Sequence, residues 1–264
     1  MEWIQVIILS IVQGLTEFLP ISSSAHLVLV PKFIGWKDQG LAFDVATHVG
    51  TLLAVLFYFK YEIISLLRDL FRSIVKRQTV GESTLAWAVL LGTIPVGLVG
   101  LVFNGAIEQY MRSPQIIAYM TIFFGIVLYV ADVRAGEKET SKITIGVALL
   151  VGIAQAFALI PGTSRSGVTM SAAMLLGFSR VASARFSFLL SIPVIVLAGG
   201  LKIIELIQSE VAVEWSVLFG AIGISAISAY VCIYWFMDLI SRSSMLPFVI
   251  YRLILGAVLF AVFM

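Results

Sequence analysis

The sequence predicts an all-α polytopic membrane protein, and three observations carry that prediction. Hydrophobic residues make up 60% of the 264 residues and charged residues only 12%, whereas soluble domains are nearer half apolar and a quarter charged. Several apolar stretches reach the roughly 20 residues that a helix needs to cross the hydrocarbon core. Two further apolar stretches are interrupted by polar motifs with proline or glycine. We therefore expect six transmembrane helices and two re-entrant helical hairpins.

The six uninterrupted stretches are the predicted spans. They cover residues 41–59, 84–104, 115–133, 186–206, 217–237 and 247–264.

The two interrupted stretches cover residues 1–37 and 143–178. The first is broken between Glu17 and Ser24, and the second at the sequence IPGTSRSG, residues 160–167. Proline and glycine break a helix, and the backbone groups that they free cannot face lipid. Such breaks are tolerated where protein or a watery cavity surrounds them, so both stretches are predicted to enter and leave the membrane on one side.

The distribution of Lys and Arg predicts the orientation, because cytoplasmic loops of membrane proteins are enriched in these residues. The basic positions gather in 60–83, 134–142, 180–185 and at Arg242. The segments predicted outside are 105–114, whose only basic residue is Arg112, and 207–216, which holds Glu210 and Glu214. Both termini then lie outside, the first hairpin enters from outside, and the second enters from the cytoplasm.

The two halves of the chain resemble each other. The sequence IVQGLTEFLPISSS before residue 25 echoes IAQAFALIPGTSRS before residue 167, with Gln13 matching Gln155 and Pro20 one position out of step with Pro161. Each half holds one broken stretch and three spans, and an odd number of spans inverts the second half. The predicted repeats are 1–133 and 143–264, arranged with inverted topology as in many transporters.

Composition argues against a nucleic-acid partner and against an internal disulfide. The net charge of +2 is small and scattered, so we expect no nucleic-acid partner and instead membrane lipids as surroundings. The single cysteine, Cys232, excludes a disulfide within the chain. The sequence leaves the oligomeric state open, and an oligomer is compatible with it.

Both breaks are predicted to be helix starts that bind an anion. Ser and Thr follow the prolines and are good N-caps, and a helix N-terminus offers free N–H groups with partial positive charge. Arg165 lies beside the second break, where a buried guanidinium must be paired or bind an anion, and its fork suits phosphate. The predicted substrate-binding set is Gln13, Ser22, Gly162, Thr163, Ser164, Ser166 and Thr169. Alternatively, Arg165 pairs with Glu17 and holds the repeats together, and the two roles are compatible.

Three side chains of the first break are predicted to be catalytic. Glu17 is ionisable at membrane depth, where such groups are usually functional. Ser23 and His26 lie three residues apart on one helix face, which favours a nucleophile with a proton donor or base. For Ser22 and Ser24, capping and packing are the expected roles.

His48 lies in an apolar span, one turn after Asp44. We expect a packed, hydrogen-bonded histidine rather than a catalyst. Glu17, His26 and Asp44 could together bind a metal, but their spacing matches none of the usual zinc patterns.

The motifs QGLTEFLPISSSAH and PGTSRSGVT, with FSFLLSIP after the second, closely resemble the signature regions of the undecaprenyl-diphosphate phosphatases of the bacitracin-resistance type. The resemblance covers nearly the whole chain. It implies hydrolysis of undecaprenyl diphosphate to undecaprenyl phosphate at the outer, periplasmic face of the bacterial inner membrane. This reaction recycles the lipid carrier of peptidoglycan synthesis and confers bacitracin resistance.

The resemblance also assigns residues. The family's essential glutamate, serine, histidine and arginine fall on Glu17, Ser23, His26 and Arg165. Some members carry glutamate at the position of Gln13, which weakens any mechanism that needs a second carboxylate there. Arg185 occupies a position that is acidic in some relatives, and we assign it no role.

The expected mechanism is attack by Ser23 or His26 on the terminal phosphorus, with Glu17 as base or proton shuttle. The resemblance adds a divalent cation, Mg²⁺ or Ca²⁺, that bridges the diphosphate. The competing hypothesis is a lipid-phosphate flippase or secondary transporter, because inverted repeats with broken helices are typical of transporters. A pure transporter would release no phosphate from a prenyl diphosphate in detergent.

Overall fold

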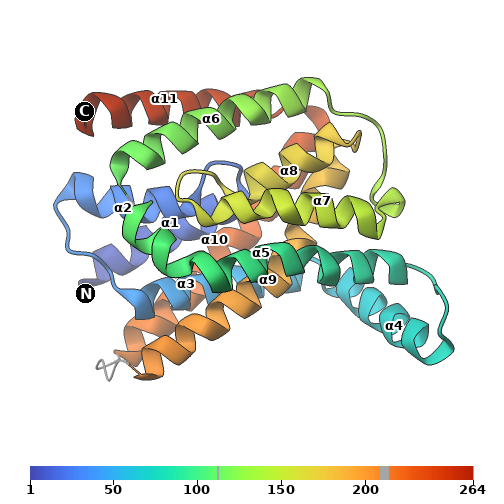
Figure 1. Cartoon of the computed structure of the whole chain (residues 1–264). Coiled ribbons are helices and arrows are strands. Elements are labelled where there is room, and N and C mark those ends of the chain that lie inside the picture. The colour runs from blue at the N-terminus through green and yellow to red at the C-terminus, as the bar shows by residue number, and fades with distance from the viewer. Residues whose placement is uncertain (112, 209–213, 264) are drawn as a thin grey trace.

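The computed structural model describes residues 1–111, 113–208 and 214–263, and over these ranges the chain is a bundle of α-helices (Figure 1). The regular elements there are all helical, apart from one isolated bridge between Lys138 and Phe178. This confirms the predicted all-α class. Arg112 and Glu210, which entered the orientation argument, lie outside the described residues.

Six helices of the described chain are long and apolar enough to cross a membrane, as predicted. They are α3 (Leu41–Tyr58), α5 (Ser83–Tyr110), α6 (Pro114–Val133), α9 (Arg180–Gln208), α10 (Trp215–Arg242) and α11 (Leu246–Phe263).

Each interrupted stretch forms a pair of short helices. The first pair is α1 (Trp3–Phe18) and α2 (Ser23–Ile34), and the second is α7 (Ile145–Ala156), followed by the 3₁₀ turn η2 (Phe157–Leu159), and α8 (Arg165–Leu175). The longest of these, α1, has 16 residues, which at about 1.5 Å per residue is shorter than the roughly 30 Å hydrocarbon core. Both pairs turn back in the middle of the molecule, and they open toward opposite ends (Figure 1).

The two turns share an unusual backbone conformation. Ser22 has φ 73° and Ser164 has φ 71°, a left-handed region that costs an L-residue about 1–2 kcal/mol. Each serine directly precedes the second helix of its pair. The number of residues between Ser22 and Ser164 equals the number between Gln13 and Gln155. The unusual backbone conformation therefore recurs at the same spacing as the similar sequences. This agreement supports the predicted inverted repeat.

The packing of the two hairpins also corresponds. Helix α1 packs on α10 and helix α7 packs on α5, so each hairpin rests on the middle span of the opposite half. Glycines allow both contacts, because a side chain at Gly14 would collide with the α10 backbone near Ser225, and one at Gly152 with Gly92 of α5. Small residues serve in this way at close helix contacts within membranes.

The segment 60–83, which its basic residues led us to expect as a cytoplasmic loop, contains the helix α4 (Lys60–Lys76). Its Tyr61, Ile64, Leu67 and Phe71 side chains are exposed and recur every three or four residues, and the helix also carries Lys60, Arg68, Arg72 and Lys76. An exposed apolar stripe on a helix rich in Lys and Arg is typical of a helix that lies in the membrane interface. The loop interpretation was wrong because an amphipathic helix contains no continuous apolar run.

Ion pairs tie the elements near α4 together. Arg185 of α9 donates to Glu62 of α4 at 2.8 Å, and Arg180 donates to Asp132 of α6 at 2.5 Å. Burial raises the pKa of Glu62 above its ordinary value, and Arg185 opposes that rise. Arg185, to which the sequence assigned no role, therefore anchors α4 to the bundle.

The largest hydrophobic cluster joins both halves of the chain. Phe18, at the end of α1, meets Phe188 of α9 edge to face, with 5.1 Å between ring centroids. Met170 of α8 is buried in the same cluster. The first turn follows Phe18, and the second turn ends at Ser164, before the helix α8 that carries Met170, so this core holds the turns against each other.

Candidate active site

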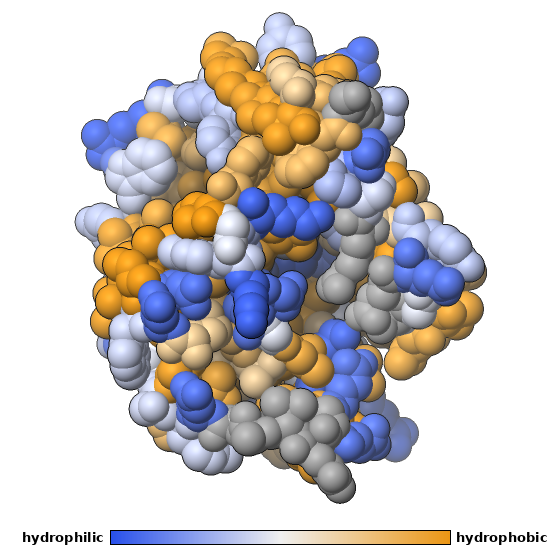
Figure 2. Space-filling model, turned by 90° about the vertical axis from the view of Figure 1, so that its left-hand side faces the viewer, coloured by the Kyte–Doolittle hydropathy of each residue, from blue (hydrophilic) through white to orange (hydrophobic). Residues whose placement is uncertain are grey.

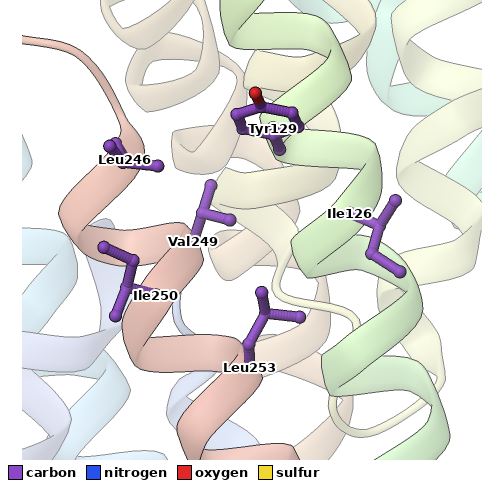
Figure 3. Close-up of a pocket in the computed structure, with 6 residues that line it drawn as sticks. All are labelled: Ile126, Tyr129, Leu246, Val249, Ile250 and Leu253. Carbon is purple, nitrogen blue, oxygen red and sulfur yellow. The ribbon is translucent and has the colours of Figure 1, made fainter.

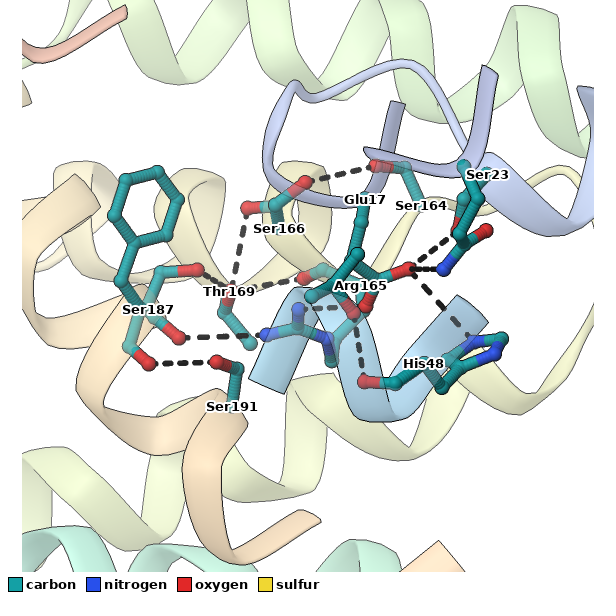
Figure 4. Close-up of polar contacts among 12 residues, drawn as sticks. Glu17, Ser23, His48, Ser164, Arg165, Ser166, Thr169, Ser187 and Ser191 are labelled. Atoms are coloured by element: carbon teal, nitrogen blue, oxygen red, sulfur yellow. Dashed lines mark hydrogen bonds and ion pairs between the residues drawn. The ribbon is translucent and has the colours of Figure 1, made fainter. Parts of the chain in front are cut away.

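A buried ion pair joins the two turns. Glu17 lies in the last turn of α1 and Arg165 is the first residue of α8. The Arg165 Nη2 atom donates to Glu17 Oε1 at 2.9 Å, and the side chains are 12% and 6% exposed (Figure 4). The structure thus brings together two residues that the sequence placed in different halves.

The second carboxylate oxygen of Glu17 accepts two further hydrogen bonds. Ser23 Oγ donates to Oε2 at 2.7 Å, and Gln13 Nε2 donates to it at 3.0 Å (Figure 4). Gln13, Ser23 and Arg165 therefore hold the carboxylate in one orientation. A carboxylate that receives the hydrogen bond of a serine hydroxyl can take its proton, which is the arrangement of a nucleophile and its base.

His48 of α3 also reaches this carboxylate. Its Nε2 atom lies 3.9 Å from Glu17 Oε2, and its side chain is 38% exposed. The Nδ1 atom hydrogen-bonds to the Asp44 carbonyl at 2.7 Å, so it must carry a proton. The ring consequently turns Nε2 toward the carboxylate. His48 is hydrogen-bonded as expected, but it also faces Glu17, which the sequence prediction did not include.

His26 lies differently from the expectation. Its Nδ1 atom donates to the Ser22 carbonyl at 2.7 Å, and its Nε2 atom meets the Tyr251 hydroxyl of α11 at 2.5 Å. The two rings are stacked with 5.7 Å between centroids. Both ring nitrogens thus have partners other than Ser23, whose hydroxyl bonds to Glu17. The predicted Ser23–His26 pair is replaced by a Ser23–Glu17 pair.

The start of α8 is held by its own hydroxyl groups. Ser164 Oγ accepts from the Gly167 N–H at 3.2 Å and caps the helix, as predicted. Ser166 Oγ donates to the Leu19 carbonyl at 2.8 Å, which links α8 to the first turn. Thr169 Oγ1 meets Ser187 Oγ of α9 at 2.7 Å (Figure 4). These hydroxyls shape the site around Arg165.

The remaining predicted binding residues differ in their partners. Thr163 is fully buried, and its Oγ1 atom has no hydrogen-bond partner in the described part of the chain. The Gly162 carbonyl accepts from Arg252 at 2.9 Å. Ser22 does not cap α2 through its side chain; its Oγ atom meets Ser24 Oγ at 3.2 Å instead.

The site is accessible from the side of α2. Ser24 is exposed and Ser23 half-buried, whereas Gln13 and Thr169 are fully buried. Figure 2 views the end of the molecule that carries both termini, and hydrophilic residues gather there around a recess in the middle of the face. The hairpin of α1 and α2 opens toward this end (Figure 1).

A pocket between α6 and α11 lies apart from this chemistry (Figure 3). Its lining residues are Ile126, Tyr129, Leu246, Val249, Ile250 and Leu253. They provide one hydroxyl and no charge, so this pocket offers no charged group to a diphosphate.

The described residues do not form a protein cage for a metal ion. No three His, Cys, Asp or Glu side chains converge within the described ranges. Glu17 already accepts hydrogen bonds at both of its oxygens. The residues present therefore do not fit a resident Mg²⁺ or Ca²⁺, which prefer several oxygen ligands.

Two polar residues near the site were missed by sequence reasoning. His48 was treated as packing, and nothing along α3 indicates that it faces Glu17 of another helix. Arg252 was passed over inside the span 247–264, although it is the only charged residue there. An ionisable residue inside a membrane span is a signal of function, and that signal was available.

The family model described as bacitracin resistance protein BacA matches residues 6–258. An undecaprenyl-diphosphatase of Campylobacter curvus is 62% identical over 100% of both chains. One from Campylobacter concisus is 61% identical, again over 100% of both chains. A protein of Stutzerimonas stutzeri called undecaprenyl-diphosphatase 2 is 58% identical, over 100% of this chain and 99% of its own.

Proposed function

The chain belongs to the family of the bacitracin resistance protein BacA, and we propose that it hydrolyses undecaprenyl diphosphate to undecaprenyl phosphate and inorganic phosphate. The observation that carries the proposal is the meeting of Glu17, Ser23 and Arg165 between the two re-entrant turns. Identity of 58–62% to undecaprenyl-diphosphatases along the whole chain supports the substrate.

The position of the site suits a lipid substrate. A long prenyl tail stays in the hydrocarbon layer while the diphosphate enters between the hairpins. The N-termini of α2 and α8 both begin at the turns, and their free N–H groups favour anions. Arg165 supplies the positive charge. Its Nη2 atom is held by Glu17, whereas Nη1 makes only a long contact of 3.5 Å with the Ser187 carbonyl and can turn toward a phosphate.

In the first step, Ser23 Oγ attacks the terminal phosphorus and passes its proton to Glu17. The bond between that phosphorus and the bridging oxygen breaks, and undecaprenyl phosphate leaves with the proton from Glu17. A phosphoserine remains at Ser23. The 2.7 Å hydrogen bond between Ser23 and Glu17 favours serine over His26 as nucleophile, because both nitrogens of His26 are bound elsewhere.

In the second step, water attacks the phosphoserine. Glu17 takes a proton from that water, inorganic phosphate leaves, and Ser23 Oγ recovers the proton. His48 Nε2 lies 3.9 Å from the same carboxylate oxygen and is partly exposed, so it is placed to exchange protons between Glu17 and solvent. Arg165 stabilises the phosphoryl charge in both steps, which is the main requirement of phosphoryl transfer.

A divalent cation, if the reaction uses one, binds the diphosphate rather than a cage of protein ligands. Glu17 is the one carboxylate that touches Arg165 in the described structure. The protein residues thus supply the serine, its base and the guanidinium.

The site opens to the periplasmic face of the inner membrane. The basic residues of 60–83 and 134–142 lie at the end of the molecule opposite both termini (Figure 1), and basic segments face the cytoplasm. The first hairpin opens toward the end with the termini, where Ser23 is reached. The product, undecaprenyl phosphate, is reused as the lipid carrier of peptidoglycan synthesis. This recycling of the carrier confers bacitracin resistance.

Phosphate release tests the proposal. Purified protein in detergent, given undecaprenyl diphosphate, is expected to release phosphate, and Glu17→Gln is expected to abolish it. A lipid transporter, the alternative, would bind the substrate and release no phosphate. The measurement is repeated with a chelator to determine whether a divalent cation contributes.

A further inference from the structure

Arg252 of α11 is the largest fully buried side chain of the described residues, with 0% exposed. Its hydrogen-bond acceptors in the structure are four backbone carbonyls. Nε donates to Thr121 at 3.1 Å, Nη1 to Pro20 at 3.1 Å, and Nη2 to Gly162 at 2.9 Å and Met120 at 3.3 Å. A guanidinium buried at membrane depth is costly, so these bonds indicate a specific purpose.

Two of these carbonyls occupy matching places in the two turns. Pro20 lies two residues before Ser22, and Gly162 lies two residues before Ser164. One guanidinium therefore bonds to the same position of both turns. Both carbonyls lie at helix breaks, where the regular helical donors are absent, and such groups must be satisfied inside the protein. Arg252 supplies a donor to each turn at once.

The geometry of the guanidinium explains why arginine stands here. Its donors form a rigid planar fork, which reaches α6, the first turn and the second turn together. A lysine ammonium is a single point of charge on a flexible stem and cannot span the same set of carbonyls. Gly125 of α6 faces Arg252, and a Cβ there would lie 3.2 Å from Arg252 Cβ, so the contact is tightly packed.

The two bonded carbonyls lie three residues before the chemically important side chains. Pro20 precedes Ser23, and Gly162 precedes Arg165, each in the same turn. We propose that Arg252 is a positioning residue for the reaction: it fixes the two turns relative to each other and thereby sets the distance from Ser23 and Glu17 to Arg165. It does not touch the substrate.

This inference rests on the proposed function, and phosphate release by purified variants tests it. Arg252→Met keeps a similar length without donors, and Arg252→Lys keeps the charge without the fork. Both are expected to lower kcat at least about 100-fold, with KM changed much less, because misplacing reactive groups by about 1 Å costs that much. Arg242→Met is the control, since the Arg242 side chain is 75% exposed and pairs with nearby Asp238; it is expected to retain the wild-type kcat.

A double-mutant cycle separates positioning from mere stability. If Arg252 acts through the placement of Ser23, then Arg252→Met should reduce the residual rate of Ser23→Ala much less than it reduces the wild-type rate. Rates are expressed per folded protein from the monodisperse chromatography peak. A full additional loss in the Ser23→Ala background would mean a structural role only and would overturn the inference.

If Arg252→Met does not fold, a second variant tests the inference. Gly125→Ala presses a methyl group against Arg252 without removing it and is expected to lower kcat severalfold at unchanged KM. Wild-type kcat in Gly125→Ala or in Arg252→Lys contradicts the positioning role. If the wild-type protein itself releases no phosphate, the proposed function fails instead, so the two failures are distinguishable.

Discussion

Glu17 and Arg165 come from opposite halves of the chain and meet at 2.9 Å in the middle of the molecule. Each ends or begins a helix too short to cross the membrane. The pair therefore connects the two re-entrant hairpins directly. It also means that the guanidinium holds Glu17 through Nη2 while Nη1 can turn to a bound diphosphate, so substitutions at either residue affect binding and chemistry together.

Arg165→Lys is expected to lose most phosphate release while the protein still folds. Lysine keeps the charge but not the planar fork that can hold Glu17 and a phosphate together. Arg185→Lys is the matched control, because Arg185 pairs with Glu62 of α4 rather than with a residue of the two turns. Turnover is measured with both purified variants. Near-normal activity of Arg165→Lys would show that two-pronged phosphate binding by Arg165 is not needed.

Ser23→Ala is expected to lower the rate at least about 100-fold, the low end of what a positioned proton-transfer or nucleophilic group contributes. Ser24→Ala should retain most activity, because Ser24 is exposed and bonds only to Ser22. Rapid quench with phosphate-labelled substrate should trap an acid-stable phosphoserine in the wild type. An acid-labile adduct would point to histidine, and incorporation of labelled water in a single turnover without any adduct would favour direct attack by water.

His48→Gln is expected to slow phosphate release by about 10-fold or more, since it removes a proton acceptor beside Glu17. The amide keeps the size and polarity of the side chain. Thr51→Val serves as control on α3, because the Thr51 hydroxyl bonds to the His48 carbonyl rather than to its ring. Equal rates for His48→Gln and the wild type would return His48 to the packing role expected from the sequence.

The predicted orientation is tested by cysteine labelling in intact cells. A cysteine placed between residues 72 and 80 should be protected from an impermeant reagent outside, because that segment is basic and predicted to be cytoplasmic. The native Cys232 is only 3% exposed and should contribute little background. Ready labelling from outside would show that the orientation is the opposite of the predicted one. The access to Ser23 would then lie on the cytoplasmic face.

The spans and the two breaks could be predicted because both follow from the local sequence. Long apolar runs identify spans, and Pro20, Pro161 and Gly162 identify the turns. Helix α4 was missed because its apolar residues are spaced along one side, so that no window of the segment is apolar throughout. Its recognition requires the helical period rather than the mean hydropathy.

The pairing inside the site could be predicted only in part. Ser23 and His26 were expected to act together because they lie on one helical face. That rule assumes a regular helix, but Ser23 is the first residue of α2 and follows the left-handed Ser22. Its hydroxyl consequently points back to Glu17 at the end of α1. The contacts of His48 and Arg252 depend on the packing of distant helices, which no local pattern contains.

The matching turns are alike in backbone but unlike in chemistry. When the two turns are aligned by Ser22 and Ser164, Leu159 takes the position of Glu17, and Ser23 takes the position of Arg165. Two copies of the first half would carry Glu17 twice and lack Arg165, and two copies of the second half would carry Arg165 twice and lack Glu17. Neither half alone can assemble the oppositely charged pair, so each half supplies one member of it. A chain cut after α6 would leave Glu17 without its cation, and only co-expression with the missing half could restore it.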